Sequence, residues 1–130
     1  MSESLSNEQI NTINQLDADA RYAYFTEQVI AGATVWGLKN SGGWVILTSY
    51  DDEEFIPVWS SSALAAAWAQ DAKADSMPAE ISLQDWMNEW LPGMIKNGLL
   101  IAVSPNSEDD CITLGAEELL EDMKAAQNLP

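Results

Sequence analysis

The chain has 130 residues, and its 21 Asp and Glu against five Lys and Arg give a formal net charge of −16. Hydrophobic residues make up 47% of it, which is enough for a globular core and too much for a disordered chain. Such an acidic surface repels the phosphates of nucleic acids and anionic lipids, because binding either depends on Lys and Arg. We therefore expect no nucleic-acid or membrane partner. A basic protein is the favoured partner, and the alternative is that the charge serves solubility alone.

Three features of the sequence bear on the cellular compartment. Residues 1–8 have neither the basic start nor the apolar core of a secretory signal. The longest apolar run, residues 99–103, is far too short to span a membrane. Cys111 is the single cysteine, so an intramolecular disulfide is impossible, which is consistent with a reducing compartment. We predict a cytoplasmic protein of bacterial type.

The first elements in chain order are two helices. Ser6 and Gln9 have the spacing of a capping box at a helix start. Asp17 or Asp19 is the expected cap of a second helix, which we expect Gly32 to end.

A three-stranded antiparallel meander is predicted next, at residues 34–39, 44–49 and 55–59. The middle strand carries consecutive apolar side chains, so we expect it to be central and buried on both faces. Pro57 has no N–H to donate to a sheet, which predicts an edge or a bulge in the third strand.

The second half of the chain predicts helices and a hairpin. We expect first a helix capped by Ser60, Ser61 or Ser62 and then a loop at 75–79. A helix capped by Ser82 follows; it should kink or restart at Pro92 and keep Met94 and Ile95 on its apolar face. Strands at 99–103 and 111–114 and a last helix at 116–127 complete the chain. We therefore predict one α+β domain over residues 1–130. Its meander and C-terminal hairpin would form one sheet with helices packed on it.

Aromatic and glycine landmarks recur in a recognisable order along the chain. They are Arg21-Tyr22-Ala23-Tyr24-Phe25, Val35-Trp36-Gly37-Leu38, Gly43-Trp44, Ile56-Pro57-Val58-Trp59, Trp90-Leu91-Pro92-Gly93 and Gly98-Leu99. In order and spacing the chain resembles, over roughly residues 21–120, the bacterial family labelled domain of unknown function 2750. The resemblance brings no established activity, so it implies no catalytic residue.

The six tryptophans allow two interpretations. All lie on predicted apolar faces, which favours a role in the core. Indole faces can also bind ligands by stacking and cation–π attraction. If any is exposed, we expect Trp59, beside the Pro57 edge, and Trp90, beside the Pro92 kink. An exposed aromatic patch there would mark an interaction site.

Arg21 is the single guanidinium and could hold a carboxylate through two hydrogen bonds, with Tyr24 nearby. The alternative is an internal salt bridge to one of the many acids. The predicted binding residues are therefore Trp59, Trp90, Arg21 and Tyr24.

The side chains that usually perform chemistry are scarce. Histidine, the side chain best suited to proton transfer at neutral pH and the commonest metal ligand, is absent. The acids at 51–54 are consecutive and point in different directions, which is typical of a solvated turn rather than of a metal site. We predict no catalytic residue, no metal site and no cofactor.

Two functional hypotheses follow. The leading one is a non-enzymatic intracellular module that binds a protein partner, for which the acidic surface favours a basic protein. An immunity-like inhibitor of a basic toxin would be a special case. The alternative is a small-molecule or metal-binding domain with a Trp-lined pocket and Arg21 or carboxylates as polar anchors. The sequence leaves the oligomeric state open.

Overall fold

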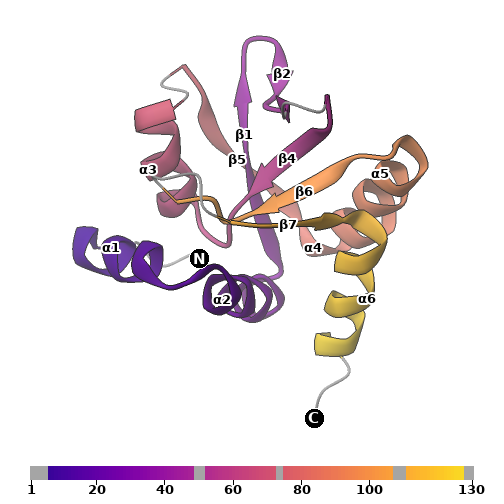
Figure 1. The fold of residues 1–130 in the computed structure, drawn as a ribbon, viewed down its shortest axis with the longest axis horizontal. Coiled ribbons are helices and arrows are strands. Elements are labelled where there is room, and N and C mark those ends of the chain that lie inside the picture. The colour runs from indigo at the N-terminus through magenta and orange to yellow at the C-terminus, as the bar shows by residue number, and fades with distance from the viewer. Residues whose placement is uncertain (1–5, 49–51, 73–74, 107–110, 128–130) are drawn as a thin grey trace.

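Two β-sheets lie at the centre of the protein (Figure 1). The computed structural model describes residues 6–48, 52–72, 75–106 and 111–127. Within these ranges one sheet has the order β2-β1-β5 and the other β3-β4-β6-β7. The strands are β1 (Thr34–Asn40), β2 (Gly43–Trp44), β3 (Leu47–Thr48), β4 (Glu54–Val58), β5 (Met77–Ser82), β6 (Leu100–Val103) and β7 (Ile112–Gly115). The α+β class is confirmed, but the prediction of a single sheet is wrong.

The chain passes from one sheet to the other between β2 and β3. The predicted strand at 44–49 is divided there, with Val45 buried and Ile46 43% exposed. Both fragments are edge strands, so the prediction of a central, doubly buried strand is wrong. A run of consecutive apolar residues is consistent both with a strand buried on its two faces and with a segment that crosses from one sheet to another. Tertiary contacts decide which of the two forms.

Two strand pairings join segments that are distant in sequence. β5 pairs antiparallel with β1 from Thr34 opposite Ser82 to Lys39 opposite Met77, so the predicted loop at 75–79 is wrong from Met77 onward. Pro78 is tolerated there because β5 lies at the edge of its sheet. β4 and β6 pair in parallel, which extends the confirmed antiparallel pairs β3–β4 and β6–β7 into one sheet.

Pro57 lies inside a sheet, since β4 is flanked by β3 and β6, and the edge prediction is wrong. On the β3 side of β4, pairing with β3 ends at Phe55. Farther along the same side, Trp59 exchanges backbone hydrogen bonds of 2.8 and 2.9 Å with Trp36. Backbone N–H directions alternate along a strand, so the nitrogen of Pro57 faces the gap between these two contacts. The missing N–H therefore costs no ladder bond.

Helices flank the sheets, with α1 and α3 on one side of the view in Figure 1 and α5 and α6 on the other. They are α1 (Asn7–Gln15), α2 (Ala18–Gly32), α3 (Ser62–Ala72), α4 (Leu83–Asp85), the π-helical segment η1 (Trp86–Trp90), α5 (Leu91–Asn97) and α6 (Ala116–Gln127). The predicted capping box is confirmed, because Ser6 and Gln9 bond each other's backbone N–H groups at 2.8 and 3.1 Å. The caps by Asp17, Ser61 and Ser82 are confirmed as well.

The helical stretch from α4 to α5 changes its hydrogen bonding at Pro92. Leu91 donates its N–H to the carbonyl oxygen of Trp86, five residues earlier, and Pro92 has no N–H for the carbonyl of Asn88. A kink or restart was expected at Pro92, and the α-helical segment α5 begins beside it at Leu91. Met94 is buried as expected, but Ile95 is 40% exposed, so its predicted place on the apolar face is wrong.

The core consists of two hydrophobic clusters. The larger packs α2, α5, α6 and the strands β1, β4 and β6 around the fully buried Trp86, and the smaller surrounds Trp59 and Trp68 against α3. Trp36, Trp44 and Trp90 are half-buried and pack on these clusters. No helix among the described residues is both long and apolar enough to span a membrane.

Candidate functional site

Two of the four predicted binding residues, Arg21 and Trp59, are inside the protein. Trp59 is 1% exposed, so the expectation that it offers an exposed aromatic surface is wrong. Arg21 is 0% exposed. Neither side chain can be reached by a ligand without rearrangement of the core.

Both residues contact the backbone that follows β6. Arg21 donates from Nε to the carbonyl oxygen of Ser104 at 3.0 Å, and Trp59 donates from Nε1 to that of Pro105 at 3.1 Å. Arg21 also donates to the carbonyl oxygen of Leu16 at 2.6 Å, and the side chain of Asn106 donates to the carbonyl oxygen of Asn14 at 3.1 Å. We call Arg21, Trp59, Ser104, Pro105 and Asn106 the Ser104 cluster. It ties the end of β6 to α1 and α2, because buried carbonyl oxygens need donors.

The other two predicted binding residues lie apart from this cluster and from each other. Tyr24 is half-buried on α2 and lines a shallow hollow beside α1 together with Ser6 and Thr12. Trp90 is half-buried in η1, with its ring edge-on to that of Trp44 at 4.8 Å between centroids. The four residues therefore do not form one site.

The described carboxylates lie on the surface of the molecule. Every Asp and Glu whose side chain the structure describes is exposed. A charged carboxylate loses much hydration free energy when it is buried, so this distribution follows from the composition.

Helix α6 separates two surface hollows. Leu119 and Met123 point into the core and are 0% exposed. Asp122, Ala125 and Ala126 lie on the side that faces α2, whereas Leu120, Lys124 and Gln127 lie on the other side. Residues three and four apart share a helix face, which accounts for this division.

The first hollow is a groove of about 610 Å³ between α2 and α6, which we call the α2–α6 groove. Small or apolar side chains form most of its lining: Ala23, Ile30, Ala31, Ala125 and Ala126. Among the described lining residues two are charged, Glu27 and Asp122, and both are exposed acids. The groove therefore combines an apolar surface with negative charge.

Tyr22 connects the two helices beside this groove. Its hydroxyl donates to Oδ2 of Asp122 at 2.5 Å. Burial raises the pKa of Tyr22 far above its ordinary value, and the hydrogen bond to Asp122 and the charges of Asp122 and Glu118 raise it further. Tyr22 therefore stays protonated and keeps donating to Asp122 at neutral pH.

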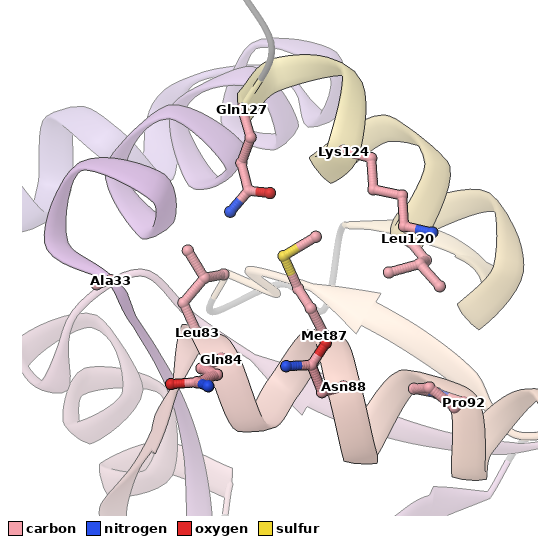
Figure 2. A pocket seen from close by; sticks show the side chains of 9 residues that line it. All are labelled: Ala33, Leu83, Gln84, Met87, Asn88, Pro92, Leu120, Lys124 and Gln127. Carbon is pink, nitrogen blue, oxygen red and sulfur yellow. The ribbon is translucent and has the colours of Figure 1, made fainter.

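The second hollow, of about 620 Å³, lies between α6 and the stretch from α4 to α5, and we call it the α6 pocket (Figure 2). Leu83 and Met87 point from α4 and η1 into the space beneath α6, and Gln127 reaches down toward them. Among the described residues that line it, the polar ones are Gln84, Asn88, Lys124 and Gln127, which supply an ammonium group and no carboxylate.

Sequence reasoning singled out neither hollow. Alanine, glutamine and asparagine on exposed helix faces carry no signal of their own, and the helices that form each wall are distant in sequence. The one local signal near the α6 pocket is Pro92, which marks the π-helical segment beside it.

The alternative prediction of a Trp-lined or metal-binding pocket gains no support from these hollows. The lining residues of the α2–α6 groove, the α6 pocket and the shallow hollow beside α1 include no tryptophan. Within the described ranges, no three metal-ligating side chains form a group that could hold an ion.

Taken together, the fold and the hollows define an acidic α+β protein in which helices pack on two small sheets. The family model described as Protein of unknown function (DUF2750) matches residues 22–123. The chain belongs to this family, as its aromatic and glycine landmarks indicate. A comparison with curated proteins finds no match to this sequence.

Proposed function

We propose that this protein is an interaction module that binds a basic, amphipathic helix of a protein partner in the α2–α6 groove. The observation that carries the proposal is the composition of the groove, an apolar lining whose two charged residues are Glu27 and Asp122. Binding rather than catalysis is the proposed role, and the cytoplasmic location stays a prediction.

The shape of the groove suits a helix. Two packed helices leave a furrow between their side-chain ridges, and a third helix can lie in it at an interaxial distance of about 8–10 Å. Small side chains permit the closest approach, and Ala23, Ala31, Ala125 and Ala126 supply them here. The apolar face of the partner would cover this surface and provide most of the binding free energy.

The charge of the groove suits lysines and arginines on the flanks of that helix. Glu27 and Asp122 are exposed and lie on opposite helices, so each can meet a cation from one flank. The net charge of −16 would accelerate the encounter with a basic partner over a longer range.

Two synthetic peptides test the proposal. One is a Lys/Leu/Ala peptide of about 18 residues with its leucines on one helical face, and the other has the same composition in scrambled order. We expect the amphipathic peptide to bind about tenfold more tightly by titration calorimetry, because its leucines reach the groove. Equal affinities would overturn the proposal, since they would show attraction by charge alone.

A steric variant locates the binding surface. Ala125→Trp fills the groove without changing the charge, and we expect it to abolish the preference for the amphipathic peptide. Ala66→Trp, at an exposed position of α3 outside the groove, is the matched control and should keep that preference. If both variants behave alike, the groove is not the binding site.

A further inference from the structure

We propose that the α6 pocket binds a small monocarboxylate with a short aliphatic body. The pocket lies on the opposite side of α6 from the α2–α6 groove, so this inference does not rest on the proposed function. Its volume, about 620 Å³, falls within the range of about 300–1,000 Å³ that is usual for small-molecule sites.

The charge of the lining identifies the kind of ligand. The chain has 21 acids and five bases, yet the described residues of the pocket lining include Lys124 and no acid. The α2–α6 groove and the hollow beside α1 are both lined by at least one carboxylate. Among the described residues Lys124 has no ion-pair partner, so its ammonium group is available to a ligand anion.

The neutral polar groups complete a carboxylate site. Gln84, Asn88 and Gln127 each carry a primary amide, and a primary amide offers two N–H donors. A carboxylate has two oxygens that together accept about four hydrogen bonds, so an ammonium group and primary amides are the kinds of donor that it needs. Figure 2 shows Lys124 and Gln127 projecting from α6 and Asn88 from the opposite wall.

The apolar part of the lining limits the rest of the ligand. Leu83 and Met87 on one wall and Leu120 on the other are buried or half-buried and form the apolar part of the described lining. An aliphatic chain of a few carbons would cover these side chains. The net charge of −16 opposes the approach of each additional negative charge, which favours a monoanion over a di- or triphosphate.

The local backbone supports a built pocket at this place. Met87 and Asn88 belong to the π-helical segment, and Pro92 at the rim cannot donate to the carbonyl oxygen of Asn88. π-Helical insertions in α-helices occur frequently at functional sites, because they change which side chains face a neighbouring element.

Hexanoate is the probe that tests this inference. We expect a dissociation constant on the order of 1 mM, because the ligand is small and the pocket open. Titration of the isotope-labelled protein, followed by NMR, should shift the side-chain amide signals of Gln84, Asn88 and Gln127. Absence of shifts at these signals up to about 20 mM hexanoate, or shifts confined to other residues, would overturn the inference.

Matched variants and a neutral ligand test the role of Lys124. We expect Lys124→Gln to weaken hexanoate binding at least about fivefold, whereas Lys96→Gln, an exposed lysine outside the pocket, leaves it unchanged. Gln127→Leu, which removes one amide at similar volume, should also weaken binding. Hexanamide, which lacks the charge, should bind at least about fivefold more weakly than hexanoate to the native protein. Equal affinity for hexanamide, or unchanged binding in Lys124→Gln, would overturn the assignment of a carboxylate site.

Discussion

The Ser104 cluster and the two flanks of α6 differ in what their residues do. Arg21 and Trp59 are residue types that commonly bind ligands, yet both are buried and donate to backbone carbonyl oxygens. The flanks of α6 carry ordinary residues such as Ala125 and Gln127, yet these line the hollows. Residue type therefore indicates a function only when the fold leaves the side chain accessible.

This contrast leads to a general expectation for mutagenesis. Substitutions in the Ser104 cluster should lower the free energy of unfolding and leave the affinity of the folded protein unchanged. Substitutions at exposed flank positions of α6 such as Ala125 and Gln127 should lower affinity and leave the free energy of unfolding nearly unchanged, because exposed positions contribute little to stability. Asp122 is the exception, because it accepts the hydrogen bond from Tyr22.

The largest effect is expected for Arg21→Met. This change removes the donors to the buried carbonyl oxygen of Ser104 and the partly buried one of Leu16, at a cost of about 3 kcal/mol in total. Denaturant unfolding would measure it. Lys96→Met is the matched control, because Lys96 is exposed and the charge change is the same; it should stay within about 0.5 kcal/mol of the native protein. Similar losses for both variants would contradict the structural role of Arg21.

A smaller effect, on binding rather than stability, is expected when both acids of the α2–α6 groove are neutralised. Glu27→Gln combined with Asp122→Asn should weaken binding of the amphipathic basic peptide about tenfold at low salt, or about 1.4 kcal/mol. The peptide titration described above would measure it, and hexanoate binding should not change.

The control for this pair is Glu54→Gln combined with Glu80→Gln. Both residues are exposed on strands outside the groove, and the net charge changes by the same amount. An equal loss of affinity in this control would show that total charge, not the groove, decides peptide binding.

The smallest effect is expected for Tyr22→Phe, which should destabilise the protein by about 1 kcal/mol at pH 7 through loss of the bond to Asp122. The pKa of Tyr22 is raised in the folded protein, so the native state holds this proton when the unfolded chain, with a tyrosine pKa of about 10, releases it. Its contribution to stability is therefore complete below about pH 10 and is lost as the pH rises further. Unfolding curves from pH 7 to 11 should show a shallower alkaline decline in the variant, and an unchanged slope would contradict this linkage.

Much of the local structure was predictable because its causes are local. The caps at Ser6, Asp17 and Ser82 depend on a side chain and a backbone N–H within three residues of each other. The hairpin of β6 and β7 follows from two apolar runs on either side of a polar segment.

The pairing of the strands was not predictable in the same way. The first half of β5 was expected to be a loop, because Pro78 discourages a strand and the partner strand β1 lies about 40 residues earlier in the chain. The parallel pair of β4 and β6 joins residues on either side of α3, β5 and α5. Helix α2 ends at Gly32 as expected, and the left-handed residue that follows is Ala33, with a φ of 55°.

The amino-acid sequence by itself determined the acidic surface, the helix starts and the family, since charge, capping and landmark order are properties of residue types and their spacing. The tertiary structure decided that Arg21 and Trp59 support the core and that α6 carries a hollow on either side. The physical reason is that burial depends on which distant segments pack together, and a side chain can bind a partner only from where that packing leaves it exposed.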